Sequence, residues 1–167
     1  MTRAASVVLS TMMAVLAVSC ATGPQTGPPA IRLGIDVCDG CGMTVSEERH
    51  AAASRDTGGE HAAHLFDDIG CLARYATRPD APPPGERFVH DYGTGAWIAV
   101  SSATFVRGNM IATPMGSGVA AFGDAGDADA LAAERGAARI SWDQIEGMAR
   151  AGTLHAGLES DHGEDAP

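Results

Sequence analysis

Short apolar stretches alternate with polar, glycine-containing turns along the first half of the chain. This pattern predicts strands joined by tight turns. The expected strands span residues 31–37, 43–45, 50–55 and 61–66. After them, residues 68–77 place apolar side chains three and four positions apart, which predicts a helix capped by Asp67 or Asp68. The first half is therefore expected to form a small unit of strands followed by one helix, at residues 31–78.

The second half is also predicted to have strands followed by helices. Four prolines within residues 79–85 predict a stiff, exposed connection, which we take as the boundary between the two halves. The expected strands beyond it span residues 87–92, 96–100, 103–107 and 119–122. Helices are expected at residues 127–135 and from the cap Ser141 to Arg150. The second unit is therefore placed at residues 86–151, and the acidic, histidine-containing tail 152–167 is expected to be disordered.

The two halves share a faint sequence echo. Leu65-Phe66-Asp67-Asp68 precedes the helix of the first half, and Ala121-Phe122-Gly123-Asp124 precedes the first helix of the second half. A glycine-rich turn lies upstream in each half, Cys41-Gly42-Met43 and Met115-Gly116-Ser117-Gly118. These patterns predict an α+β fold of two similar small strand-rich units, each with a helix.

The N-terminus has the features of an export signal. Arg3 is followed by an uncharged apolar run to Ser19, which is typical of a secretory signal peptide at residues 1–19. Small residues then lead into Cys20 in a string that resembles a bacterial lipobox, although Ala17 stands where such boxes usually carry leucine. We expect lipid to be attached at Cys20 and residues 20–30, rich in glycine and proline, to act as a tether. The alternative is an ordinary signal peptide that is cut nearby.

Charge and cysteine count narrow the possible functions. The formal net charge is −10, with 21 acidic residues against 11 arginines, which argues against nucleic acid because phosphates require a basic surface. Apart from Cys20, the chain contains Cys38, Cys41 and Cys71. In an exported protein thiols usually form pairs, so an odd number leaves at least one free, paired between chains or bound to something.

Soft donor atoms are concentrated in the string Cys38-Asp39-Gly40-Cys41-Gly42-Met43. Its glycines allow two thiols and a thioether to converge, and such sulfur ligands select Cu(I) over harder ions. A disulfide between Cys38 and Cys41, with Met43 filling the core, accounts for the same string equally well. A structural zinc site is disfavoured, because it needs four cysteine or histidine ligands and no second CxxC or HxxxH is present.

The remaining sulfur and histidine side chains give weaker signals. Met115 lies between proline and glycine in a loop, where a functional thioether is credible, although packing alone would explain it better. Cys71 is expected to be a buried packing residue of its helix, and the adjacent Asp67 and Asp68 to be caps. His61 and His64, three apart on an expected strand, would face opposite sides, and the histidines of the tail are expected to be solvated.

Four ordered blocks resemble the NosL family of copper lipoproteins, which are associated with maturation of nitrous oxide reductase. The resemblance covers residues 36–142. It rests on Cys38-Asp39-Gly40-Cys41-Gly42-Met43, on Phe66-Asp67-Asp68-Ile69-Gly70-Cys71-Leu72 with Tyr75, on Asp91-Tyr92 through Trp97-Ile98, and on Met115-Gly116-Ser117-Gly118-Val119-Ala120-Ala121-Phe122. The resemblance implies two similar α+β units, related to the fold of organomercurial lyase.

The resemblance also implies a function and a ligand set. Cu(I) would be bound on the periplasmic side, by a protein anchored to the membrane through lipid, for delivery to nitrous oxide reductase or its assembly proteins. The implied copper ligands are Cys41, Met43 and Met115, with Cys38 as a fourth. We find no Ser/His/Asp arrangement, phosphate loop or pair of catalytic carboxylates, so the chain is expected not to be an enzyme. The alternatives are a CxxC-based thiol-disulfide oxidoreductase and a general copper-handling or sequestration protein.

Overall fold

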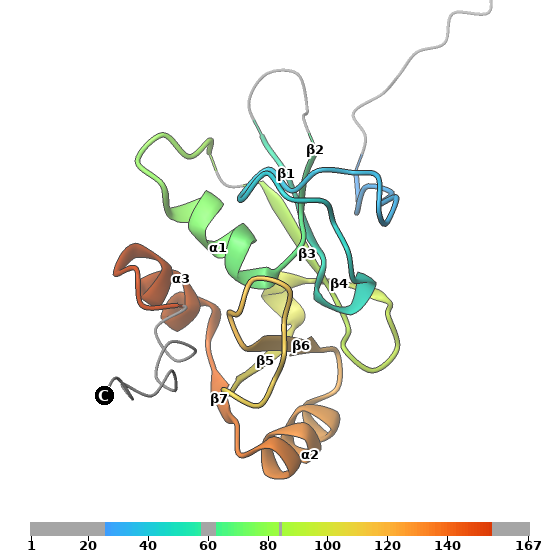
Figure 1. Cartoon of the computed structure of the whole chain (residues 1–167), viewed down its shortest axis with the longest axis vertical. Coiled ribbons are helices and arrows are strands. Elements are labelled where there is room, and N and C mark those ends of the chain that lie inside the picture. The colour runs from blue at the N-terminus through green and yellow to red at the C-terminus, as the bar shows by residue number, and fades with distance from the viewer. Residues whose placement is uncertain (1–25, 58–62, 84, 155–167) are drawn as a thin grey trace, which may run out of the picture.

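The computed structural model describes residues 26–57, 63–83 and 85–154, which form two antiparallel sheets and three α-helices (Figure 1). The elements of the first half are the 3-10 helix η1 (Glu48–His50), β1 (Ala52–Arg55), β2 (Ala63–Phe66), α1 (Ile69–Thr77), β3 (Glu86–His90) and β4 (Trp97–Ala99). Those of the second half are the 3-10 helix η2 (Val100–Ser102), β5 (Thr104–Arg107), β6 (Val119–Phe122), α2 (Ala125–Arg135), β7 (Ala138–Ile140) and α3 (Trp142–Arg150). The expected α+β class, with two strand-rich units, is confirmed.

The two sheets divide the chain at a different point from the proline-rich connection. The first sheet has the order β2-β1-β3-β4 and the second the order β6-β5-β7. We expected the units to be residues 31–78 and 86–151. However, β3 pairs with β1 in the register Ala52 to Val89, so β3 and β4 belong to the first sheet. The segment expected to be the boundary therefore lies between α1 and β3, within the first half, and the second sheet starts only after η2.

The sheets share one main hydrophobic core rather than folding independently. A parallel bridge between Asp91 and Ala121 joins them, and the Asp91 carboxylate accepts a hydrogen bond from the Gly123 backbone at 2.7 Å. Buried side chains of both halves, such as Phe66 and Phe105, lie in the same core cluster. Helix α3 packs beside α1, whereas α2 covers the second sheet (Figure 1). The duplicated units are thus fused into one body.

The expected helices form where their caps predict. Asp68 is the N-cap of α1 and Ser141 caps α3 in a reciprocal capping box with Gln144. Helix α2 begins at Ala125, two residues earlier than expected, because Asp124 accepts hydrogen bonds from the Gly126 and Asp127 backbone. The strand β7, which pairs with β5, was not predicted.

The expected strand at residues 31–37 is wrong. Arg32 and Asp36 close a turn instead: the Asp36 carboxylate accepts hydrogen bonds from the backbone and guanidinium of Arg32. An antiparallel bridge from Val37 to Thr44 is all that remains of the predicted pair of strands. A side-chain ion pair thus overrides the weak alternation of the sequence.

Several predicted features lie outside the described residues. These are the signal peptide, Cys20, most of the β1–β2 turn with His61, and the acidic tail from residue 155. Within the described part of the chain, no helix is long and apolar enough to cross a membrane.

Candidate metal centre

Three thiols converge at the start of α1. The ligand atoms of Cys38, Cys41 and Cys71 all lie within 4.8 Å of one another. Each is a free cysteine, so no disulfide joins them. Among the described histidine, cysteine, aspartate and glutamate side chains, this is the one group arranged to hold a metal ion. Three thiols at this spacing form a soft ligand set.

Glycines allow the turn Cys38–Met43, which we call the chelating turn after its predicted metal ligands, to lie directly against α1. A Cβ on Gly40 would stand 3.0 Å from Cys71 Cβ and 3.1 Å from its carbonyl oxygen, so α1 would have to move away by a few tenths of an ångström to admit it. Gly42 has a positive φ of 76°, and its N–H donates to the Cys38 carbonyl at 2.8 Å. Asp39 fixes the turn to β2 by exchanging hydrogen bonds with the Leu65 backbone.

The three thiols differ in pKa. A hydrogen bond from the Cys71 thiol lowers the pKa of Cys38 to about 5, against the opposing effect of burial. The same hydrogen bond, together with burial, raises the pKa of Cys71, and burial also raises the pKa of Cys41. Arg74 donates to Cys71 Sγ at 3.1 Å and brings a positive charge to the cluster. The site therefore favours a single thiolate before any metal binds.

The methionine loop of the second half is tied to the same helix start. The Asp68 carboxylate, fully buried, accepts from Gly70 N–H at 2.6 Å, from the Thr113 hydroxyl at 2.7 Å and from Met115 N–H at 3.0 Å. A Cβ on Gly70 would come within 2.7 Å of Ser117 Cβ. The cysteine turn of the first half and the methionine loop, residues 113–118, therefore both contact the first turn of α1.

The two methionines differ in their surroundings. Met115 is partly buried against the core cluster that contains Cys38 and Cys71. Met43 is 57 % exposed, while Cys38 in the same turn is 1 % exposed. The sulfur-containing side chains thus range from fully buried to exposed to solvent. Metal binding by the thioether of Met43 or Met115 stays a prediction.

Comparison with known proteins places this geometry in a family. The family model described as NosL matches residues 33–149. This chain belongs to the NosL family. The fold is similar to the crystal structure of the copper chaperone NosL from Shewanella denitrificans, with a TM-score of 0.64 and 22 % sequence identity, covering 72 % of this chain and 96 % of that one. Comparison with curated protein sequences gives no match.

One member of the thiol cluster was missed by sequence reasoning. Cys71 was expected to be a packing residue, and it is indeed fully buried. Its sulfur nevertheless lies with those of Cys38 and Cys41. The odd number of thiols in the chain was the signal that pointed to it. By contrast, Asp68 caps its helix as expected. The Asp67 carboxylate accepts hydrogen bonds from the backbone N–H and the hydroxyl of Ser46.

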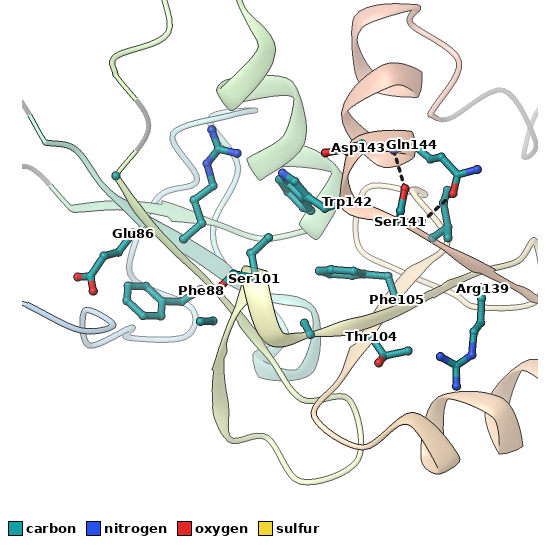
Figure 2. A pocket seen from close by; sticks show the side chains of 16 residues that line it. Glu86, Phe88, Ser101, Thr104, Phe105, Arg139, Ser141, Trp142, Asp143 and Gln144 are labelled. Atoms are coloured by element: carbon teal, nitrogen blue, oxygen red, sulfur yellow. Dashed lines mark hydrogen bonds between the residues drawn. The ribbon is translucent and has the colours of Figure 1, made fainter.

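A cavity of the NosL-family chain is separate from the cysteine cluster. It has a volume of about 900 Å³ and lies between β3, η2, β5 and the start of α3 (Figure 2). Phe88, Phe105 and Trp142 supply its apolar walls. Its two arginines already have partners, since Arg87 pairs with Glu146 and Arg139 pairs with Asp129. None of the three clustered cysteines lines it.

Proposed function

We propose that this chain binds Cu(I) through sulfur and carries it to a copper-accepting protein. The proposed ligands are Cys38, Cys41, Met43 and Met115, and Cys71 joins them because its sulfur lies in the same cluster. The observation that carries the proposal is the convergence of three free thiols within 4.8 Å. Thiolate and thioether donors favour Cu(I), whereas a structural zinc site takes four cysteine or histidine ligands.

The site suits a carrier better than a permanent metal cage. Cys38 and Cys71 are almost fully buried, but Cys41 is partly exposed and Met43 is largely exposed. An ion held there is shielded on one side and accessible on the other. The structurally similar NosL of Shewanella denitrificans is described as a copper chaperone, and membership of the NosL family supports the same role here.

Location and partner follow from the family and from the N-terminal sequence. We propose that Cys20 carries lipid and that the protein works at the periplasmic face of a membrane. The proposed acceptor is nitrous oxide reductase or its assembly machinery. In a detergent-partitioning assay the wild-type protein should enter the detergent phase and Cys20→Ala should not. Equal partitioning of both forms would argue against lipidation.

The ligand assignment can be tested by competition for Cu(I) with a chelator such as bicinchoninate. We expect Cys41→Ser and Met115→Ala each to lower the affinity by at least about tenfold, which corresponds to about 1.4 kcal/mol. Met110→Ala is the matched control, because Met110 belongs to the same loop but is 68 % exposed. Unchanged affinity in both test variants would refute the assignment. X-ray absorption of the loaded protein would count the sulfur donors directly.

A thiol-disulfide oxidoreductase is the second candidate, favoured by the low pKa of Cys38 within a CxxC turn. Its weakness is access: Cys38 is 1 % exposed and cannot reach a disulfide in another protein without local opening. Thiol titration distinguishes the two functions. A carrier should show reduced thiols that become protected by Cu(I), whereas a Cys38–Cys41 disulfide that persists with copper present would favour redox chemistry.

A further inference from the structure

The large exposed apolar side chains gather on the segment that carries the chelating turn. Within the described residues, those exposed by more than a third are Leu33, Ile35, Val37, Met43 and Met110. Four of the five lie between residues 33 and 43, and we call these four the apolar patch. Apolar side chains grouped on a surface in this way usually mark an interaction site.

Two members of the patch, Val37 and Met43, flank the turn that carries Cys38 and Cys41. Val37 and Thr44 form a bridge, and Cys38 N–H donates to the Met43 carbonyl at 2.7 Å, so the two sides of the patch are held together next to the thiols. Cys38 points inward from this turn, at 1 % exposure, while its neighbour Val37 is 58 % exposed. A partner that covers Val37 and Met43 would therefore lie next to the turn that carries Cys41, the partly exposed thiol of the cluster.

Acidic side chains outnumber basic ones in the segment that carries the patch. Residues 31–49 contain two arginines, Arg32 and Arg49, against four carboxylates, those of Asp36, Asp39, Glu47 and Glu48. Arg32 is paired with Asp36, and the side chains of Asp39 and Glu47 are 42 % and 59 % exposed. This net negative charge would be repelled by an anionic lipid surface and attracted by basic residues.

We propose that the apolar patch is the docking surface for the copper-accepting protein, which meets it with an apolar face bordered by basic residues. This inference rests on the proposed function. Docking at this surface would bring the soft ligands of the acceptor next to Met43 and Cys41, so that copper passes between proteins without entering solvent. An apolar centre with a charged rim is the usual arrangement of a protein interface.

The test makes two members of the patch polar and keeps every sulfur. The variant Ile35→Ser/Val37→Ser of the full chain is loaded with Cu(I) and mixed with copper-free nitrous oxide reductase. We expect the second-order rate of copper transfer to fall by at least about tenfold. Cu(I) affinity and the rate of copper removal by bicinchoninate should not change, because a small chelator does not need the surface. Raising the salt concentration should slow transfer from the wild-type protein.

A matched control uses Ala130→Ser/Ala133→Ser, on exposed positions of α2 away from the site (Figure 1), which should transfer copper at the wild-type rate. Wild-type transfer by the patch variant would overturn the docking proposal and leave the proposed function intact. Loss of binding to phospholipid vesicles without slower transfer would assign the patch to the membrane and also overturn it. If the wild-type protein fails to load the reductase at all, copper delivery to that enzyme falls, and this inference falls with it.

Discussion

The starts of α1 and α2 are built from the same pattern but have different surroundings. Each follows an edge strand that ends in phenylalanine, each has an aspartate N-cap two residues later, and each carries glycine two residues after the cap. The next position differs: it is Cys71 in α1 and Asp127 in α2. Six residues of α1 are buried, whereas Ala128 is the one buried residue of α2.

The comparison indicates that the site arises from what packs on the helix start, not from the cap itself. Asp124 satisfies two backbone groups of its own helix and is exposed. Asp68 satisfies one backbone group of its helix and two groups of the Thr113–Met115 loop, and it is fully buried. The N-cap aspartate of α1 thus joins the two halves, whereas the N-cap aspartate of α2 caps only its own helix.

The largest effect is expected from removing the two caps. Asp68→Ala leaves three donors without their charged acceptor, and we expect a loss of about 3 kcal/mol in the free energy of unfolding. Asp124→Ala removes an exposed cap, for which about 1 kcal/mol is expected. Urea unfolding of both variants measures the difference. Equal losses would mean that Asp68 does not join the halves.

Asp68→Asn is a milder version of the same test. The amide oxygen can still accept from Gly70, but the NH2 group that replaces Oδ2 can accept from neither Thr113 nor Met115. We expect this variant to fold and to bind Cu(I) more weakly than the wild-type protein. Unchanged Cu(I) affinity would show that the position of the methionine loop does not matter for the site.

The matching glycines should give the next largest effect. A Cβ on Gly70 would lie 2.7 Å from Ser117 Cβ and 3.0 Å from Leu154 Cδ2, whereas on Gly126 it meets Asp124 Oδ1 alone, at 2.9 Å. Gly70→Ala must push the methionine loop away and should cost about 2 kcal/mol. Gly126→Ala should be close to neutral, because better helix propensity offsets the contact with the cap. Thermal unfolding compares them, and a neutral Gly70→Ala would contradict the close packing.

Local signals in the sequence were sufficient to predict most of this architecture. Asp68 and Ser141 cap helices at the positions that their side-chain chemistry favours. Two features escaped because they depend on distant residues. β7 is three residues long and exists only through its pairing with β5, and β3 joins the first sheet by pairing with β1. No local pattern specifies such partners.

The candidate site was predictable in part for the same reason. The sulfur donors of the CxxCGM string can be recognised from sequence, because they all lie in one turn. Cys71 has helical neighbours and reads as a packing residue, and its place beside Cys38 follows from the docking of Gly40 on α1. The role of Asp68 as the joint to the Met115 loop, 47 positions away, is equally invisible in sequence.

Cys71→Ser sharpens the comparison at the position where the two helices differ. Serine keeps a small polar side chain but removes a soft donor, so we expect Cu(I) affinity to fall by about tenfold, or about 1.4 kcal/mol. The free energy of unfolding of the metal-free protein should change less. The control is Asp127→Ser at the equivalent position of α2, which should leave Cu(I) binding unaltered. An unaltered affinity in Cys71→Ser would return this residue to the packing role predicted from sequence.

The smallest effect concerns acid stability, which should also be confined to one half. His50, in η1, and His90, at the end of β3, are buried in the first half, and residues 103–140, which hold the second sheet and α2, contain no histidine. Burial lowers the pKa of both histidines, so the unfolded chain binds protons more readily than the folded one. Stability should therefore be complete above about pH 6.5 and fall below it, by at most about 1.4 kcal/mol per histidine at pH 5.5.

His50→Phe tests this with little other disturbance. Among the residues that the structure describes, His50 Nδ1 finds no hydrogen-bond partner, and its ring lies 5.6 Å from that of Tyr92, a contact that phenylalanine preserves. The measured quantity is the difference in free energy of unfolding between pH 7.5 and pH 5.5, in which any uniform change in stability cancels. We expect the difference to shrink by about half, because His90 still titrates. If the variant loses as much stability in acid as the wild-type protein, the carboxylates of Asp68 and Glu47, which favour the charged imidazole, outweigh burial at this position.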